Sequence, residues 1–259
     1  MVSPPDPLAA HDIALIRAAN PGPFTLSGTN TWVAGRDPCW VIDPGPALDD
    51  HLQAILVEGG TRGGIGGIAL THGHADHTEG VPALVRETEA PVAAMEHPAD
   101  VRLGDGATFG PLTAIATPGH APDHLAFVLG SACFTGDAVL GEGSVFVAPD
   151  PGALRGYLAA LATLAALDLD VLCPGHGPVV GDPAAKLDQY VRHRLDRERR
   201  LIDAMDDGLR TAAELLDRVW DDVPPTLRPA AAVTLAAHLD KLSEEGRLPG
   251  GVERPAGFG

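Results

Sequence analysis

Short apolar runs and longer amphipathic stretches alternate along the first two thirds of the chain. Apolar runs of this length, bounded by glycine and proline, are typical of buried strands, whereas apolar residues at helical spacing predict helices that cover a sheet. The predicted strands are residues 65–70, 112–117, 125–129, 131–135 and 167–173. The predicted helices are residues 47–58, 78–89 and 151–167. This alternation predicts a mixed α/β (α+β) domain over residues 1–181.

The pattern changes to helices alone after residue 181. Asp182 and Pro183 suit the N-cap and the first position of a helix. Thr211 and Glu214 have the spacing of a capping box, which predicts the start of a second helix. Three helices are predicted, at residues 182–208, 211–220 and 229–245, followed by a short hairpin or wing at 246–250. Residues 182–259 are therefore predicted to form a small second domain.

Side chains that bind metals follow four of the strand-like runs, each at a turn that contains glycine. They are His72, His74, Asp76 and His77 after residues 65–70, His120 after 112–117, Asp137 after 131–135 and His176 after 167–173. Imidazole and carboxylate groups are ligands that zinc and similar divalent ions take. Seven donors exceed the four of one tetrahedral zinc, so the sequence predicts two metal ions per chain. An aspartate carboxylate has two oxygens and is able to bridge them.

The order of these motifs resembles the five-motif signature of the metallo-β-lactamase superfamily. It runs His-x-His-x-Asp-His, a histidine after Pro-Gly, Gly-Asp, and then Pro-Gly-His-Gly. The resemblance implies an αββα sandwich. It also implies that His72, His74 and His120 bind one metal ion, that Asp76, His77 and His176 bind the second, and that Asp137 bridges them. Zinc β-lactamases carry cysteine or another residue in place of Asp137, so the resemblance favours other hydrolases over antibiotic hydrolysis.

Further motifs narrow the resemblance to the β-lactamase-like protein 2 group. They lie at residues 28–31, 42–45, 117–124, 135–143, 174–178 and 190–198, and so cover most of the chain. This group carries a small winged-helix appendage after the metal-binding domain, which three helices and a wing at residues 182–259 resemble. The motifs are specific for fold and metal but much less so for substrate, because function belongs to the site and not to the fold.

The chain is acidic, with 35 Asp and Glu against 18 Lys and Arg and a net charge of −17. Proteins that bind a phosphate backbone usually present a basic face. The third C-terminal helix is rich in alanine and leucine, so we expect it to be a core or homodimer element and not a reader of DNA sequence. Residues 182–259 are expected to shape the substrate cleft or a dimer contact.

Membrane and secretion signals are not expected in this sequence. No apolar stretch reaches the roughly 20 residues that span a bilayer, and the first residues lack the charged and apolar regions of a signal peptide. Cys39, Cys133 and Cys173 each lie in or beside an apolar run. Buried reduced thiols are therefore expected, which indicates a cytoplasmic location.

Three further features leave alternatives open. Asp43 is expected either to hold the His72–His77 loop through hydrogen bonds or to form a plain Asp-Pro-Gly turn. His124 has either a catalytic, proton-donating role or a structural one. The arginine cluster at residues 192–200 is expected mainly to form a solvated, internally paired face. The alternative is that Arg194 or Arg197 pairs with the first domain or with a substrate phosphate.

The sequence predicts a hydrolase with two zinc ions and a metal-bridging hydroxide, although Mn²⁺ or Fe would also suit the donors. Asp76 is expected to hold metal and orient the hydroxide, and His124 or a bound water to protonate the leaving group. The resemblance favours cleavage of single-stranded RNA. The alternatives are hydrolysis of a thioester or acyl ester, as in acyl-carrier thioesterases and glyoxalase II, and an iron-dependent oxidoreductase like the persulfide dioxygenases.

Overall fold

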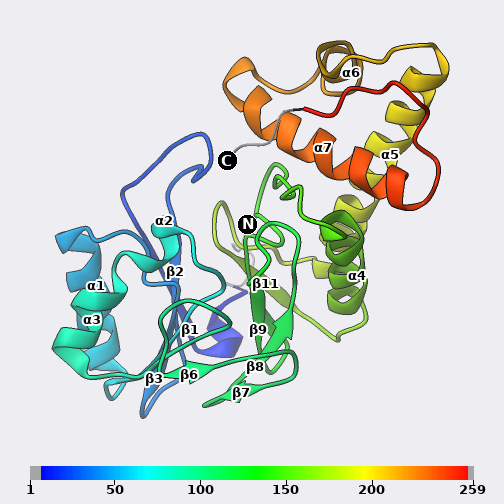
Figure 1. Ribbon diagram of the computed structural model, residues 1–259. Helices are drawn as coiled ribbons and strands as arrows, with labels where there is room; N and C mark the ends of the chain where they lie inside the picture. Colours follow the sequence, from blue (N-terminus) through cyan, green and yellow to red (C-terminus); the bar gives the residue numbers. More distant parts are fainter. Residues whose placement is uncertain (1–6, 256–259) are drawn as a thin grey trace, which may run out of the picture.

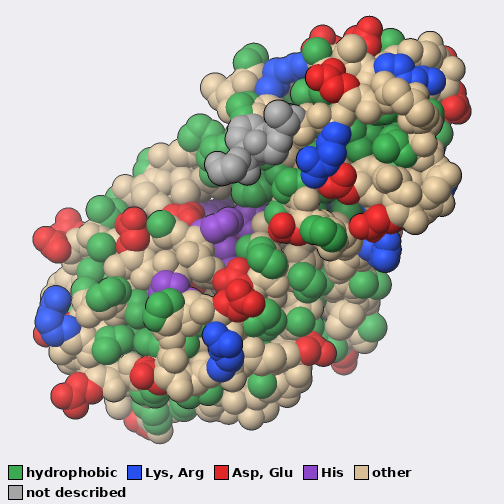
Figure 2. Space-filling view, in the orientation of Figure 1, with side chains coloured by type: hydrophobic (Ala, Val, Ile, Leu, Met, Phe, Trp, Pro, Cys, Tyr) green, Lys and Arg blue, Asp and Glu red, His purple; other side chains and the backbone are tan. Residues whose placement is uncertain are grey.

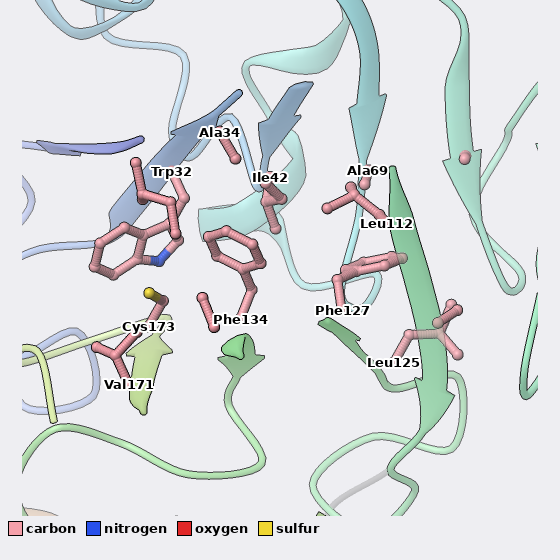
Figure 3. Packing of buried hydrophobic residues seen from close by; sticks show 14 of the residues in the cluster. Trp32, Ala34, Ile42, Ala69, Leu112, Leu125, Phe127, Phe134, Val171 and Cys173 are labelled. Carbon is pink, nitrogen blue, oxygen red and sulfur yellow. The ribbon is translucent and has the colours of Figure 1, made fainter. Parts of the chain in front are cut away.

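Two β-sheets packed face to face form the centre of the computed structural model, which describes residues 7–255 (Figure 1). The first sheet has the order β1 (Ile13–Arg17), β2 (Asn30–Ala34), β3 (Cys39–Ile42), β4 (Ile65–Ala69), β5 (Val92–Ala94) and β6 (Val101–Arg102). The second has the order β11 (Val171–Pro174), β10 (Ala132–Gly136), β9 (Leu125–Leu129), β8 (Leu112–Ala116) and β7 (Thr108–Phe109). Side chains from both inner faces, among them Trp32, Phe127 and Phe134, form one shared core (Figure 3).

Helices cover the outer face of each sheet (Figure 1). Those beside the first sheet are α1 (Asp49–Thr61), α2 (Ala75–Thr78) and α3 (Val81–Thr88), and a one-turn 3₁₀ helix, η1 (Ala9–His11), precedes β1. Ile55 of α1 and Leu84 of α3 are buried against Val41 and Ile68 of that sheet. On the second sheet, α4 (Ala153–Ala165) packs Tyr157 and Leu161 into a separate core. The αββα sandwich implied by the sequence motifs is therefore confirmed.

The C-terminal region consists of α5 (Pro183–Asp206), α6 (Ala212–Val219), the 3₁₀ helix η2 (Pro225–Leu227) and α7 (Arg228–Glu244). The Thr211–Glu214 capping box forms as predicted at the start of α6. Helix α5 contributes Leu187 to the core beside the second sheet and Leu201 to the core of the C-terminal helices, so one helix connects the two bodies. The domain boundary after residue 181 stays a prediction.

Three sequence predictions differ from the structure. The predicted helix 78–89 is split by Gly80, which separates α2 from α3. The predicted strand 167–173 begins only at Val171, because the preceding residues form a turn after α4. The segment 246–250 contains turns and forms no strand in the described part of the chain, which follows it to residue 255.

The arginines of α5 do not all face solvent. Arg192 and Arg199 are exposed and pair with nearby acids, as expected. Arg194 and Arg197 are buried instead, with 2% and 4% of their surface exposed. Arg194 donates to the backbone oxygen of Val145, which confirms the alternative that it contacts the first domain.

Among the described residues, no helix is long and apolar enough to cross a membrane.

His238 of α7 is completely buried against the ring of Trp220, 5.9 Å away between centroids. Neither ring nitrogen has a hydrogen-bond partner in the described part of the chain. Burial, with smaller effects of the charges of Arg194 and Lys241 and then of His193 and Arg197, lowers the pKa of His238 from 6.5 to about 3. The folded protein therefore holds this imidazole in its neutral form.

We predict that His238 makes the fold sensitive to acid. The unfolded chain takes up this proton near pH 6.5 and the folded chain only near pH 3, so the stability present above pH 6.5 is lost as the pH falls. The loss from this group at pH 5 should be about 2 kcal/mol relative to pH 8. Urea unfolding at both pH values should show that His238→Leu removes this part of the dependence. His97→Leu, at a partly exposed position, is the control, and an equal pH dependence in wild type and His238→Leu would contradict the prediction.

Candidate metal centre

The turns after β4, β8, β10 and β11 bring all seven predicted donors to one edge of the sandwich (Figure 1). The strands end there because glycine and proline interrupt their ladders, and the rigid sheets hold the turns in place. Figure 2 shows histidine side chains in the hollow between the two-sheet body and the C-terminal helices. The donors fall into two groups joined by one aspartate.

The first group consists of His72, His74 and His120. Nε2 of His72 lies 2.9 Å from Nδ1 of His74, and Nε2 of His120 lies 3.1 Å from the same atom. His72 and His120 are buried, whereas His74 is exposed, so the group opens toward solvent on one side. Three ring nitrogens therefore face a common point.

The second group consists of Asp76, His77 and His176. Nε2 of His176 lies 3.3 Å from Nε2 of His77 and 3.3 Å from Oδ2 of Asp76, and Nε2 of His77 lies 3.7 Å from that oxygen. Helix α2 carries Asp76 and His77, while the turn after β11 carries His176. The two histidines are buried and the carboxylate is partly exposed.

Asp137 lies between the groups. Its Oδ1 is 3.6 Å from Nε2 of His77 and 3.5 Å from Nε2 of His176, whereas its Oδ2 is 3.6 Å from Nε2 of His120. The close approach depends on Gly175, where an added Cβ would lie 2.5 Å from Oδ1 of Asp137. Each carboxylate oxygen thus faces a different group of donors.

The donor set fits a pair of divalent ions. Ligands of a tetrahedral ion with bonds of about 2.0–2.1 Å lie roughly 3.3 Å apart, close to the spacings within each group. The buried Oδ1 of Asp137 has no hydrogen-bond donor among the described residues, as expected of an oxygen that faces a cation. Whether these seven residues act as ligands stays a prediction.

The charges of the site affect its histidines differently. Burial lowers the pKa of His120 to about 4, more than Asp137 raises it. Burial also lowers the pKa of His176, but the nearby carboxylates of Asp137 and Asp76 outweigh this effect and raise it to about 10. The pKa of Asp137 lies well below 3.8, because His77 and His176 outweigh its burial. The second group therefore has the stronger attraction for positive charge.

Asp43, at the end of β3, holds the first metal-binding turn from behind. Its Oδ1 accepts from the backbone nitrogen of Thr71 at 2.8 Å, and its Oδ2 accepts from Oγ1 of Thr71 at 2.7 Å. Nδ1 of His77 lies 2.9 Å from the same Oδ2. These contacts fix the ring of His77 so that Nε2 faces the second group. Of the two sequence alternatives for Asp43, the geometry agrees with the supporting one.

His124 is fully buried beside the metal centre, at the start of β9. Its Nε2 accepts from the backbone nitrogen of Asp137 at 3.0 Å, so Nδ1 carries the proton and donates to Oγ1 of Thr117 at 2.7 Å. Burial lowers the pKa of His124 to about 3, with a smaller effect of His120 in the same direction. Both nitrogens are engaged, and the single ring proton is donated to Thr117. This arrangement favours the structural of the two possible roles of His124.

A cavity of about 790 Å³ lies beside the metal centre, and His120 and Asp137 form part of its wall. The opposite wall comes from α5, the residues after α6, and α7. Apolar side chains contribute much of the lining, including Phe24, Phe146, Trp220, Val223, Leu227 and Ala231. The C-terminal helices thus shape a cleft over the candidate metals, as the sequence analysis expected of them.

Sequence reasoning missed the loop at residues 144–147, which connects the metal centre to the cavity. The backbone oxygen of Phe146 lies 3.3 Å from Nδ1 of His120, and the nitrogen of Val147 donates to Oγ1 of Thr234 in α7 at 3.3 Å. The loop has no metal-ligand side chains and no periodic pattern. Only its position between a ligand and α7 reveals its role.

Residues 24–107 and 95–176 match the model of the metallo-beta-lactamase superfamily, and residues 211–248 match the beta-lactamase associated winged helix domain. A beta-lactamase-like protein 2 homolog from Caenorhabditis elegans is 33% identical over 257 residues, covering 90% of this chain and 85% of that protein.

Two further proteins agree with these matches. An atrochrysone carboxyl ACP thioesterase from Aspergillus chevalieri is 34% identical over 270 residues, which cover 93% of this chain and 85% of that protein. The crystal structure of a metallo-beta-lactamase family protein from Thermus thermophilus superposes with a TM-score of 0.74, covering 91% of this chain and 94% of that one at 24% identity. This last similarity concerns the fold alone.

Proposed function

Because the chain belongs to the metallo-beta-lactamase superfamily, we propose that it is a hydrolase with two divalent metal ions that cleaves a thioester or acyl ester of a largely apolar acyl group. The cavity carries this proposal, since it places apolar side chains next to Asp137 and His120. Pockets of this size and character bury small organic ligands. The similar thioesterase from Aspergillus chevalieri supports the same class of substrate.

The residues have separate roles in this proposal. His72, His74 and His120 would hold one ion and Asp76, His77 and His176 the other, while Asp137, whose oxygens face both groups, would serve both. Two such ions would supply a hydroxide nucleophile at neutral pH and polarise the acyl oxygen under attack. Asp76 is the partly exposed member of its group, and we assign it to orienting the attacking group.

The nature of the leaving group favours a thioester over other esters. His124 has both ring nitrogens engaged and is assigned to positioning Asp137. Burial, together with the charges of nearby Arg194 and Arg197, lowers the pKa of His193, in the cavity wall, to about 4. Neither imidazole is a ready proton donor at neutral pH. A thiol ionises near pH 8.5 and so leaves with little need for a donated proton.

Zinc is the ion that the donor set favours, because imidazole and carboxylate suit it at the observed spacings. Elemental analysis of protein purified without chelators should give close to two equivalents per chain. One tightly held iron and no zinc would contradict the hydrolase proposal and favour the oxidoreductase. We also propose a cytoplasmic location, because Cys39, Cys133 and Cys173 are buried and unpaired.

Cleavage of single-stranded RNA stays a prediction of the sequence, with less support from the cavity. Of the three arginines in its described wall, Arg192 pairs with Asp188 and Arg197 with Asp222, which leaves Arg194 alone without a carboxylate to bind a polyanionic backbone. A parallel assay should offer an aromatic thioester of N-acetylcysteamine and an unstructured RNA oligonucleotide to the same preparation. We expect thioester hydrolysis, and RNA cleavage with the thioester left intact would refute the proposal.

Filling the cavity should impair large acyl groups selectively. Ala230 lies in the wall at the start of α7. Ala230→Phe should raise KM for an aromatic acyl thioester by about tenfold or more, because displaced pocket contacts are worth 10–200-fold in discrimination. The acetyl thioester, which needs little space, should be affected by less than about twofold.

Ala232→Phe is the matched control, because this residue lies in the same helix outside the cavity wall. Steady-state kinetics of the three proteins on both thioesters provide the test. Equal losses on the acetyl and aromatic substrates would show that Ala230→Phe perturbs the fold and not the acyl site.

A further inference from the structure

Arg194 is a buried cation in the wall of the cavity. Only 2% of its surface is exposed. One terminal nitrogen donates to the backbone oxygen of Val145 and to Oγ of Ser144, the latter at 3.2 Å. The guanidinium also lies over the ring of Tyr157, 5.3 Å from its centroid. These partners are polar or aromatic but uncharged, so none of them neutralises the arginine.

The other arginines of the cavity wall have counter-ions. Arg197 makes two contacts of 2.7 Å with Asp222, and Arg192 pairs with Asp188. Asp196 pairs with Arg199. Within residues 7–255, Arg194 has no carboxylate within 4.0 Å, and its buried Nε has no hydrogen-bond partner. Arg194 therefore differs from the other arginines in the same wall.

An uncompensated buried charge is costly, and one in a ligand cavity indicates a ligand of opposite charge. Removal of a charge from water is unfavourable unless hydrogen bonds or a counter-ion offset the loss. An arginine fork also has more donors than Val145 and Ser144 use. A carboxylate, sulfonate or phenolate placed in the cavity would provide both the charge and the acceptors.

The surroundings of Arg194 connect it to the metal centre. It binds the backbone oxygen of Val145, while His120 contacts that of the next residue, Phe146. Beneath it, the hydroxyl of Tyr157 donates to the backbone oxygen of Ala138 at 2.7 Å, directly after Asp137. A ligand that contacts Arg194 and lies in the cavity thus also lies along the wall that contains two candidate metal ligands.

We propose that Arg194 forms an anion subsite, and that the acyl substrate carries an anionic group recognised there while its apolar part fills the cavity. The substrate identity rests on the proposed function, whereas the subsite itself does not. Among the arginines of the described cavity wall, Arg194 is the one without a carboxylate partner, so it is the cation left to bind an anionic molecule. The substrate class becomes an anionic, largely apolar acyl thioester or ester.

A matched pair of fluorescent probes tests the subsite without any need for hydrolysis. 1-Anilinonaphthalene-8-sulfonate carries an anion, and N-phenyl-1-naphthylamine has the same rings without it. The full chain should bind the sulfonate more tightly than the neutral probe. Arg194→Met, which retains an unbranched apolar stem, should weaken sulfonate binding by about tenfold or more and neutral binding by less than about twofold, because hydrogen bonds to a charged group are the stronger class.

Arg218→Met is the control, since this exposed arginine of α6 lies outside the cavity wall and has its own carboxylate, Asp207. Near-UV circular dichroism shows whether each variant keeps its native packing, because loosened proteins bind such probes nonspecifically. Arg194→Lys keeps the positive charge and should retain part of the preference. Equal weakening of both probes by Arg194→Met, or of neither, would overturn the anion subsite.

Kinetics on paired thioesters then locate the anion within the substrate. One pair compares an acyl group that carries a carboxylate with its methyl ester, both on neutral N-acetylcysteamine. The other compares the neutral acyl group on N-acetylcysteamine and on phosphopantetheine. An Arg194-dependent preference of about tenfold in KM should appear in the first pair. Such a preference in the second pair alone would place the anion in the thiol part and overturn its assignment to the acyl group. If no thioester is hydrolysed but the sulfonate probe still binds, only the proposed function is rejected.

Discussion

Replacing Asp137 with alanine should almost abolish hydrolysis and lower the metal content of the protein. The two oxygens of this carboxylate face different donor groups, with Oδ1 toward His77 and His176 and Oδ2 toward His120. Without it, two cations would face each other with no shared negative charge. Breaking a buried charged interaction costs about 3–5 kcal/mol, which corresponds to a fall in kcat/KM of roughly 10²–10⁴-fold.

Elemental analysis and thioester kinetics on the same preparations test this expectation. Asp188→Ala is the control, because it removes an exposed carboxylate of α5 that pairs only with Arg192. Circular dichroism should show that both variants are folded. Wild-type turnover and two metal equivalents in Asp137→Ala would show that the assignment of the bridging residue is wrong.

The candidate metal centre could be predicted because its chemistry is local. His72 to His77 lie within six residues, and each remaining donor directly follows a strand and a glycine turn. Short-range signals also predicted the capping box of α6 and five of the strands. Strands of two or three residues, such as β5 to β7, have too few alternating positions to be predicted this way.

The orientation of individual side chains could not be predicted where it depends on packing. The arginines of α5 alternate with acids around the whole helix, so the sequence does not show which of them faces α4 and the loop at residues 144–147. Contacts with Val145 and Tyr157 decide that Arg194 is buried. The cavity likewise combines segments near residues 24, 145 and 230, which no periodic pattern connects.

The C-terminal helices illustrate the difference between a fold and its use. Residues 211–248 match a winged helix domain, yet α7 directs its buried side chains, such as Leu235 and Leu239, into a core and lines the cavity with Ala230 and Ala231. Helix α7 also holds Val147 through Thr234, and this loop contacts His120. The appended helices therefore serve as one wall of the candidate active site.

Replacing Asp43 with asparagine should weaken the second metal site by about 10–100-fold, the usual effect of removing a partner that orients a metal-binding histidine. The carboxylate accepts from the backbone and side chain of Thr71 and contacts Nδ1 of His77. Asparagine has one acceptor oxygen in place of two. Its NH₂ group, which cannot accept, would therefore face either the backbone nitrogen of Thr71 or both Oγ1 of Thr71 and Nδ1 of His77. The ring of His77 would lose the contact that directs Nε2 toward His176.

Asparagine is the sharper test than alanine, because Asp43 has a φ of 52° and asparagine tolerates this left-handed backbone. Competition with a chromogenic chelator should resolve two metal-binding steps. In the variant, only the affinity of the ion at the site of His77 should be lower. Asp50→Asn, at an exposed position in the first turn of α1, is the control. Unchanged affinities at both steps would mean that burial alone orients His77, since its ring is already enclosed on every side by the turn after β4 and by Asp137.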